Sequence, residues 1–351
     1  MRREKGSHVG VVGCGAIGSF LAMLLARLIG VAHITLVDPG AYEESNLHSQ
    51  NIFPCDVNQL KVGALARRLR SANPALEVTA IPSAVEDVPP GRLRADLIVA
   101  CTDSLRSRQT INQLAWCLRT PWIDTGVLES EKLARVNVYV AAADSPCWEC
   151  AMSDDDYKLL EAEYPCGAGG EAERPSDTSA ALASLAASLA AIECHKMLTG
   201  DASFAAVGRQ VTADVRTHRM LSTSFRRNPS CRFDHASWDL VPLRCSLHRF
   251  TVADALAVTG RLQVAGHRFA RQMACPMCGL RLDGLRLNRP KARCLKCGAR
   301  MITPGFDGLL TELDATLPEQ HMTRSLAQVG LRSGDVICGT DKQFELLGEG
   351  R

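Results

Sequence analysis

Residues 8–39, HVGVVGCGAIGSFLAMLLARLIGVAHITLVDP, constrain the fold of this chain more than any other segment. They predict an apolar strand, a tight glycine turn, an apolar helix and a second strand that ends at Asp38. The turn has the pattern Gly-x-Gly-x-x-Gly, formed by Gly13, Gly15 and Gly18. Such glycines let the backbone approach a phosphate at a helix N-terminus, and an acid about 20 positions later accepts from a ribose hydroxyl. The segment predicts a nucleotide site, with NAD, FAD and ATP all open.

Strand and helix patterns continue to alternate as far as about residue 127. The expected helices span about 58–70 and 104–119, and the expected strands span 76–81 and 96–102. Alternation of this kind predicts a parallel sheet with helices on both faces. We therefore expect an α/β fold with a Rossmann-like, doubly wound, mostly parallel sheet.

Composition excludes several classes of protein. The net charge of +2 over 351 residues gives no reason to expect binding to nucleic acid or membrane. The charged N-terminus runs directly into the first strand and does not resemble a secretory signal, and the apolar run 178–198 has enough polar residues to suit a buried helix. Fifteen cysteines then indicate metal and thiol chemistry in a reducing, cytoplasmic setting.

Two Cys-x-x-Cys pairs lie close together near the C-terminus. They are Cys275, Cys278, Cys294 and Cys297, and each pair is followed directly by a glycine. Four thiolates at this spacing predict a closed tetrahedral zinc site, which leaves no open position for catalysis. Free thiols or an iron centre are the alternatives.

A third pair, Cys147 and Cys150, has no second pair beside it. Its expected partners follow the apolar run: Cys231 and one of Asp234 or His235, of which we favour His235. Zinc held by these residues would join the sheet to the segment after that run. The alternative is a pair of buried cysteines with nothing bound.

Three further residues could act in binding or catalysis, or could have an ordinary structural role. Asp103 follows a buried strand, where it could contact Mg²⁺ or nucleotide, or simply cap a helix. Lys61 opens a helix and could reach a phosphate, although a lone lysine is usually solvated. Cys166 stands in the glycine-rich loop EYPCGAGG, exposed enough for a nucleophile but among acids that do not lower its pKa.

These segments, in this order, resemble the ubiquitin-activating superfamily. The closest likeness is to its small members that activate ubiquitin-like and sulfur-carrier proteins in thiamin and molybdopterin biosynthesis and in bacterial ubiquitin-like pathways. The resemblance covers residues 8 to about 235. The segments are GCGAIGS, SNLHSQNIF, DVNQLKVGALARRLRSANP, ACTDSLRSRQTIN, CWEC, the Cys166 loop, IECHKMLTG and RRNPSC.

The resemblance implies ATP rather than NAD. It places the three glycines along the nucleotide and implies that Asp38 holds the ribose. It implies that Asn46 and Lys61 contact phosphates, that Asp103 binds Mg²⁺ and that Gln50 is a further nucleotide-binding residue. It also implies zinc at Cys147, Cys150 and Cys231, and makes Cys166 the thiol that takes over the activated carrier.

The chain departs from the family pattern at two points. Ser49 stands where the family usually has an arginine that binds phosphate. His48, Arg106, Arg108 or a partner subunit are the candidates to supply the positive charge in its place. The second zinc pair is replaced by Cys231-Arg-Phe-Asp followed by His235, so the fourth ligand stays open.

The expected function is adenylation of the C-terminal carboxylate of a ubiquitin-like or sulfur-carrier protein that ends in diglycine. Transfer to Cys166 would follow, as a thioester or as sulfur transfer. The resemblance implies a homodimer, and a conjugating enzyme is a further candidate partner. An NAD-dependent oxidoreductase, an enzyme that adenylates a small-molecule or RNA carboxylate, and a non-enzymatic zinc-ribbon adaptor remain alternatives.

The chain is expected to divide into two parts. Residues 1–235 form the ATP-binding part, with a mobile loop at about 151–176. Residues 236–351 form an extension with a zinc ribbon at 275–297 and a tail, about 300–348, that resembles the late segment of a β-grasp fold. This extension would dock a carrier or a conjugating enzyme, or serve only for packing.

Overall fold

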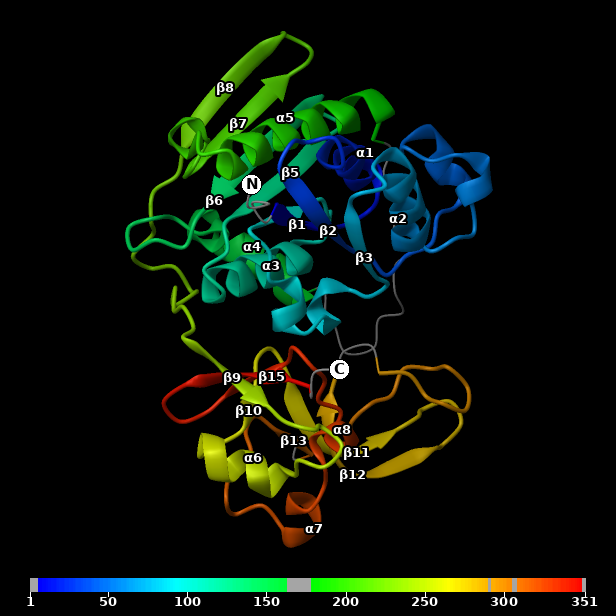
Figure 1. Cartoon of the computed structure of the whole chain (residues 1–351), viewed down its shortest axis with the longest axis vertical. Helices are drawn as coiled ribbons and strands as arrows, with labels where there is room; N and C mark the ends of the chain where they lie inside the picture. The colour runs from blue at the N-terminus through cyan, green and yellow to red at the C-terminus, as the bar shows by residue number, and fades with distance from the viewer. Residues whose placement is uncertain (1–5, 163–177, 290–291, 305–307, 349–351) are drawn as a thin grey trace. The chain divides into compact units, whose positions relative to one another are not determined.

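The computed structural model describes residues 6–162, 178–289, 292–304 and 308–348. The chain forms two compact units, which are described separately (Figure 1). The first unit comprises residues 1–85 and 94–237, and the second comprises residues 86–93 and 238–351. Residues 86–93, expected in the first part of the chain, thus belong with the C-terminal extension, where Gly91 donates its N–H to the carbonyl of Gly334 at 2.8 Å.

The first unit is built on an eight-stranded sheet in the order β3-β2-β1-β4-β5-β6-β7-β8. Its strands are β1 (Ser7–Val12), β2 (Val31–Val37), β3 (Glu77–Ile81), β4 (Leu97–Ala100), β5 (Trp122–Leu128), β6 (Leu133–Tyr139), β7 (Arg209–Asp214) and β8 (Arg219–Ser224). Strands β1 to β5 are parallel, and β6, β7 and β8 continue the sheet as an antiparallel arm. The expected Rossmann-like sheet is confirmed. The strand order reverses between β1 and β4, which is where open α/β sheets bind ligands.

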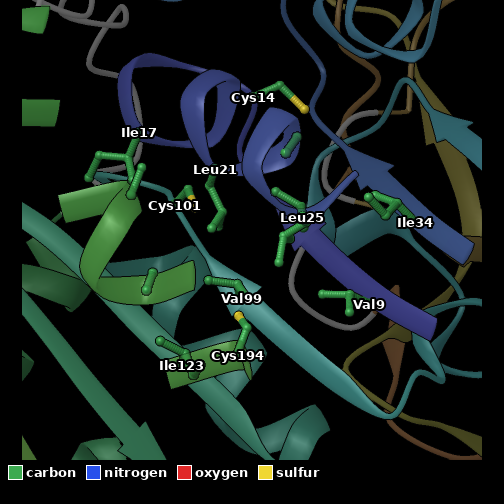
Figure 2. Close-up of a cluster of buried hydrophobic side chains, with 14 of the residues drawn as sticks. Val9, Cys14, Ile17, Leu21, Leu25, Ile34, Val99, Cys101, Ile123 and Cys194 are labelled. Atoms are coloured by element: carbon green, nitrogen blue, oxygen red, sulfur yellow. The ribbon is translucent and has the colours of Figure 1, made fainter. Parts of the chain in front are cut away.

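Helices cover both faces of this sheet (Figure 1). They are α1 (Ala16–Leu25), α2 (Lys61–Ala72), α3 (Leu105–Cys117), α4 (Asp154–Ala162) and α5 (Ala180–Leu198). Helices α1, α2 and α5 share one apolar core with alternate strand residues such as Val9, Ile34 and Val99, as Figure 2 shows for part of the cluster. Alternate residues of one strand point to opposite faces, so Asp124 of β5 lies on the other face, where it pairs with Arg108 of α3.

Helix α5 alone among the described helices has the length and apolar composition of a membrane span. Its small side chains are nevertheless packed inside the first unit: Ala183, Ala186, Ala187 and Ala190 are fully buried. The lack of large side chains on this face lets α5 approach both α1 and the sheet closely. Residues 180–198 therefore form a core helix, as their composition predicts.

The second unit contains two smaller sheets, ordered β10-β14-β15-β9 and β12-β11-β13. Its strands are β9 (Leu240–Arg244), β10 (Gln263–Val264), β11 (Arg268–Ala274), β12 (Arg281–Asn288), β13 (Leu309–Leu310), β14 (Val336–Cys338) and β15 (Gln343–Leu347). Its helices are α6 (Val252–Thr259), α7 (Glu319–Met322) and α8 (Leu326–Val329). Strand β15 pairs in parallel with β9, so the tail completes a sheet that begins before the cysteine pairs. A β-grasp-like tail at 300–348 stays a prediction.

Candidate nucleotide site and metal clusters

The glycine loop is packed so tightly that side chains are excluded at two of its three glycines. A Cβ on Gly13, whose φ is +94°, would lie 2.6 Å from the carbonyl oxygen of Cys101 at the end of β4. A Cβ on Gly18 would collide with the carbonyl oxygen of Gly13. A Cβ on Gly15, by contrast, would meet nothing within 4 Å. The loop is thus closed toward β4 and α1 and open at Gly15, which precedes the first residue of α1 and its unpaired N–H groups.

Asp38 holds the glycine loop in place from the end of β2. Its carboxylate accepts hydrogen bonds from the N–H of Cys14 and of Gly40, both at 2.7 Å. The side chain of Lys61 lies against the same turn, with its Cε 3.4 Å from the position of a Cβ on Gly40. Burial and the neighbouring Asp38 raise the pKa of the Cys14 thiol, so this cysteine stays neutral. The structure therefore brings Asp38, Lys61 and the glycine loop together.

Tyr42, which no sequence pattern singles out, joins these groups. Its hydroxyl donates to the carbonyl oxygen of Cys14 at 3.0 Å, and Lys61 Nζ lies 5.8 Å from the centre of its ring. The side chain is almost completely buried, at 1% exposure. Tyr42 thus supports the glycine loop, and because it sits in an irregular polar stretch no periodic signal could have identified it.

The segment that carries Asn46 and Gln50 lies next along the chain, in and after the short 3₁₀-helix η1 (Glu44–His48). The Asn46 side-chain oxygen accepts from the N–H of Glu43 at 3.0 Å, so this oxygen closes the helix start. Gln50 Oε1 is buried and has no hydrogen-bond partner in the described part of the chain. Buried acceptors are normally satisfied, so this oxygen fits a site where a bound molecule supplies the missing donor.

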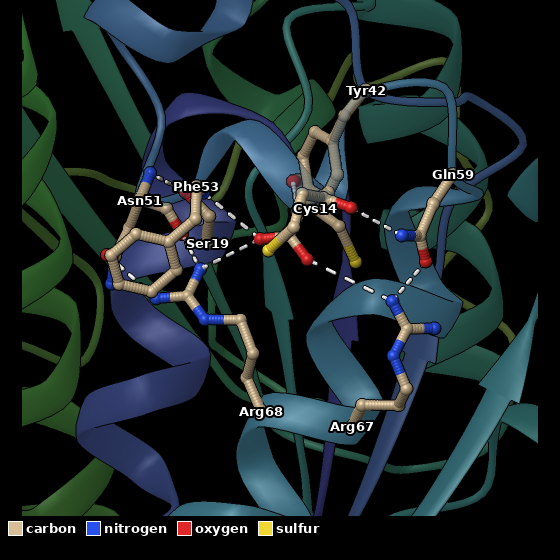
Figure 3. A network of polar contacts seen from close by, with 10 residues as sticks. Cys14, Ser19, Tyr42, Asn51, Phe53, Gln59, Arg67 and Arg68 are labelled. Atoms are coloured by element: carbon tan, nitrogen blue, oxygen red, sulfur yellow. Dashed lines mark hydrogen bonds and ion pairs between the residues drawn. The ribbon is translucent and has the colours of Figure 1, made fainter.

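Arg68 of α2 reaches over the loop just after Ser49, as Figure 3 shows. Its guanidinium donates to the backbone and side-chain oxygens of Asn51 and lies 4.7 Å from the centre of the Phe53 ring. Arg68 follows Lys61 by two helical turns, so spacing alone could have placed both on one face of the helix. Its guanidinium also lies 3.9 Å from the buried carboxylate of Asp56, which offsets part of the positive charge that it brings to the loop after Ser49.

Asp103 follows β4 in the loop that contacts Gly13. Ser104, and not Asp103, caps α3, because Ser104 Oγ accepts from the N–H of Ser107 at 3.3 Å. The helix-cap interpretation of Asp103 is therefore wrong, and its carboxylate remains exposed. Arg108 donates to the backbone carbonyl of Asp103 at 3.3 Å. Asp103 directly follows Thr102, whose backbone N lies 3.1 Å from the point where a Cβ would stand on Gly13. The exposed carboxylate of Asp103 thus belongs to the loop that packs against the glycine loop.

A buried ion-pair network supports this loop from the α3 face of the sheet. Asp124 is fully buried and receives Arg108 at 2.9 Å and Arg135 at 2.7 Å. Proximity to Asp124 raises the pKa of Arg135, so this arginine stays charged. Arg108 therefore positions the Asp103 loop, and its own charge is already neutralised by Asp124. His48, another candidate to supply the positive charge of the missing arginine, lies exposed at the end of η1.

The first cysteine cluster has the geometry of a tetrahedral metal site. Cys147 Sγ lies 3.7 Å from Cys150 Sγ and 3.8 Å from Cys231 Sγ, and His235 Nε2 lies 3.4 Å from Cys150 Sγ. Zinc with Zn–S bonds of about 2.3 Å requires sulfurs about 3.8 Å apart, which these distances match. Asp234 instead accepts from the N–H of Ala236 at 2.9 Å. Of the two candidates for the fourth metal ligand, Asp234 and His235, the structure places His235 in the cluster.

Trp116 of α3 fixes the orientation of His235. Its indole N–H donates to the His235 carbonyl at 2.6 Å, and the two rings meet edge to face with centroids 4.8 Å apart.

Burial and the neighbouring thiols of Cys150 and Cys231 raise the pKa of Cys147. Thiolates can accumulate here only with a compensating cation, so the donor set fits a metal ion.

The second cluster lies at the turns of the small β12-β11-β13 sheet. The Cys275 and Cys297 sulfurs are 3.4 Å apart and those of Cys278 and Cys294 are 3.5 Å apart. Gly279 and Gly298, with φ of +69° and +74°, follow the two pairs, as expected for such turns. All four ligand atoms lie within 4.8 Å of one another, so this set too could hold a metal.

The predicted nucleophile, Cys166, lies outside the described residues. The loop predicted at 151–176 is described only in part. Residues 154–162 form α4, a helix that the polar, acidic sequence of this segment did not predict.

The chain is similar to proteins that are named as adenylyltransferases. It is 27% identical over 228 residues to the sulfur carrier protein ThiS adenylyltransferase of Escherichia coli, covering 64% of this chain and 84% of that protein. It is 32% identical over 164 residues to the adenylyltransferase and sulfurtransferase UBA4 of Yarrowia lipolytica, covering 46% of this chain and 39% of that protein. The chain thus spans well under half of the longer relative.

Solved structures share the fold. The crystal structure of E. coli MccB with ATP superimposes with a TM-score of 0.53 at 24% identity, covering 65% of this chain and 66% of that one. Residues 1–233 match the sequence profile of the ThiF family. Since this match covers about two thirds of the chain, including the glycine loop, Lys61, Asp103 and the three cysteines of the first cluster, the chain belongs to the ThiF family.

Proposed function

We propose that this chain uses ATP to adenylate the C-terminal carboxylate of a ubiquitin-like or sulfur-carrier protein that ends in diglycine. One observation carries the proposal: Lys61, Asp38 and the open glycine loop lie together, and the loop contacts Cys101, two residues before the exposed Asp103. Two similar proteins are named as adenylyltransferases. Coenzyme binding by an oxidoreductase would use the loop and Asp38 but would leave Lys61 and Asp103 without a role.

The chemistry needs charge stabilisation more than proton transfer. The carrier carboxylate is already ionised when it attacks the α-phosphorus, and pyrophosphate leaves, so no general base is required. Lys61 and the N–H groups at the start of α1 would stabilise negative charge on the phosphates. Asp103 would hold Mg²⁺, which when bound neutralises phosphate charge and orients the leaving group. Arg108 would keep Asp103 in position through its backbone carbonyl.

Gln50 and Arg68 would complete the site. The unpartnered Gln50 oxygen is an acceptor for a donor group of the nucleotide. Arg68 lies over the segment with Ser49, and we propose that it supplies part of the charge that the family's arginine gives elsewhere. A homodimer, in which a partner subunit adds a cation, is compatible with the same chemistry.

Transfer from the adenylate would follow at Cys166. Its thiolate would attack the acyl carbon, and AMP would leave with the bonding electrons to form a thioester; sulfur transfer to the carrier is the other outcome. Zinc in the Cys147 cluster would hold the segment after β8 against the turn that carries Cys147 and Cys150, and zinc in the Cys275 cluster would hold the turns of the second unit. Both zinc ions are structural in this proposal. Docking of the carrier or of a conjugating enzyme is proposed for residues 236–351.

Pyrophosphate exchange tests the proposal. Exchange of labelled pyrophosphate into ATP should depend on Mg²⁺ and on a carrier with a free diglycine carboxylate. The matched control is the same carrier with a C-terminal carboxamide, which cannot be adenylated. Exchange with a small carboxylic acid or an RNA alone would contradict the carrier as substrate. Turnover of nicotinamide coenzyme without ATP would contradict adenylation altogether.

A further inference from the structure

The second unit contains a group of positively charged side chains with no acidic partner among the residues that the structure describes. They come from three places in the chain: Arg271 on β11, Arg286 on β12, and Arg324 between α7 and α8. Within the described ranges, none of the three forms an ion pair with a carboxylate. Just beyond the strand that carries Arg286, Arg289 does have such a partner, the buried Asp335 at 2.8 Å. Among the described residues, these three arginines therefore lack the acidic partner that Arg289 has.

A β-bulge brings the three arginines together. The register of β11 against β12 shifts between Ala270 and Gln272, so that Gly284 and the residue after it lie opposite Arg271. Gly284 has a φ of +98°, as expected for a glycine bulge, and bulges redirect side chains. A Cβ on Gly284 would lie 2.6 Å from Nη1 of Arg324, so only glycine leaves room for that guanidinium against the strand. Arg286 follows the bulge directly and stands opposite Ala270 of β11.

His321 closes the group from the side of α7. Its exposed fraction is only 8%, and its Nδ1 has no hydrogen-bond partner in the described part of the chain. Its backbone carbonyl accepts from the N–H of Arg324 at 3.4 Å, which links the two residues. Nε of Arg286 and Nε of Arg324 are likewise buried and unpartnered. Three buried nitrogens without partners are uncommon, because buried polar groups are normally satisfied.

The directions in which the pKa values of Arg324 and His321 shift agree with this geometry. Burial, and then the charge of Arg286, lowers the pKa of Arg324. Burial, followed by Arg271 and Arg324, lowers the pKa of His321. Like charges gathered at a partly dry site destabilise the unit unless an anion neutralises them.

We propose that the second unit carries a binding site for a phosphate-type oxyanion, formed by Arg271, Arg286, Arg324 and His321. Planar guanidinium groups hydrogen-bond phosphate oxygens in pairs, and three of them suit a dianion better than a single carboxylate. Arg271 is exposed and admits the anion, whereas His321 lies buried at the inner side. The site is independent of the nucleotide site in the first unit.

The test uses the full chain with histidine-selective isotope labels and inorganic phosphate as the probe. The Lys61→Ala background removes phosphate binding at the candidate nucleotide site, and the His321 signals are assigned by their loss in His321→Gln. Phosphate should shift these signals saturably, and chloride or acetate at equal ionic strength should not. Arg271→Gln should weaken the apparent affinity about tenfold, since one charge-assisted hydrogen bond is removed.

Two controls make the outcome decisive. Arg281→Gln alters an exposed arginine on the same sheet and should leave phosphate affinity unchanged. Arg271 is itself exposed, so its substitution leaves the core intact, and an unchanged histidine spectrum without phosphate verifies folding. Absence of a saturable shift, an equal response to acetate, or equal weakening in Arg281→Gln would each overturn the proposal.

Discussion

The carbonyl oxygen of Cys101 lies 2.6 Å from the point where a Cβ would stand on Gly13. This contact joins the loop after β1 to the end of β4, the two strands between which the sheet order reverses. Gly13→Ala would have to push β4 and its following loop away and would also strain a φ of +94°. We expect it to abolish ATP binding and to destabilise the first unit by about 2–4 kcal/mol, measured by nucleotide titration and urea unfolding.

Gly15 is the matched control for this substitution. A Cβ there meets no atom within 4 Å, so Gly15→Ala should fold with nearly unchanged stability while still obstructing the nucleotide. Equal destabilisation by the two substitutions would contradict the packing argument.

Lys61→Ala should remove a phosphate contact without disturbing the fold. The charge on Nζ lies beside the glycine loop, and loss of one preorganised electrostatic contact typically lowers the rate by about 10²–10³-fold. Carrier-dependent pyrophosphate exchange measures the effect. Lys158→Ala changes a lysine of α4 that pairs with the exposed Asp155, and its exchange rate should equal that of the wild type.

Asp124→Asn should be strongly destabilising. It leaves Arg108 and Arg135 around a neutral group in a buried position, which typically costs about 3–5 kcal/mol. The control is Glu131→Gln, which breaks the exposed pair with Arg216 and should change the free energy of unfolding by less than about 1 kcal/mol. Urea unfolding compares the two, and similar small effects would show that the Asp124 network is dispensable.

The two cysteine clusters should each hold one zinc ion. Metal analysis of the purified chain should find two zinc ions, and Cys147→Ser and Cys294→Ser should each reduce the content to one. Cys55→Ser alters an exposed free cysteine and should leave both ions bound. Retention of both ions by Cys147→Ser would contradict the first site.

Acid should destabilise the second unit through His267. Burial, followed by Arg289 and Arg332, lowers the pKa of His267 to about 4. The unfolded chain takes up a proton below pH 6.5 and the folded chain does not, so stability is complete above pH 6.5 and falls toward pH 4. Between pH 7.5 and pH 5 this histidine should account for a loss of about 1–2 kcal/mol. Unfolding of His267→Gln should lack this component, whereas the exposed His248→Gln should retain it.

Sequence was most informative where backbone geometry demands one residue type. The glycine loop, the strand alternation and the two Cys-x-x-Cys pairs at 275–297 have fixed spacings, and the structure places these residues as those spacings require. Contacts between residues that lie far apart in the sequence were harder to predict. Tyr42 acts through a hydrogen bond to Cys14, and the arginines near Gly284 meet only because of a β-bulge, neither of which leaves a periodic pattern. The choice between Asp103 and Ser104 as helix cap depended on a difference of one residue at a boundary, which sequence patterns resolve poorly.

The most direct measurement of the central claim is the intact mass of a diglycine-ended carrier after incubation with ATP, Mg²⁺ and the Cys166→Ala form of this chain, in which the acyl group cannot move on to the proposed thiol. The account predicts that the carrier gains the mass of one AMP moiety and that Lys61→Ala and the carboxamide form of the carrier do not show this gain. An unmodified carrier, from a preparation that is folded and has both metal sites filled, would contradict it.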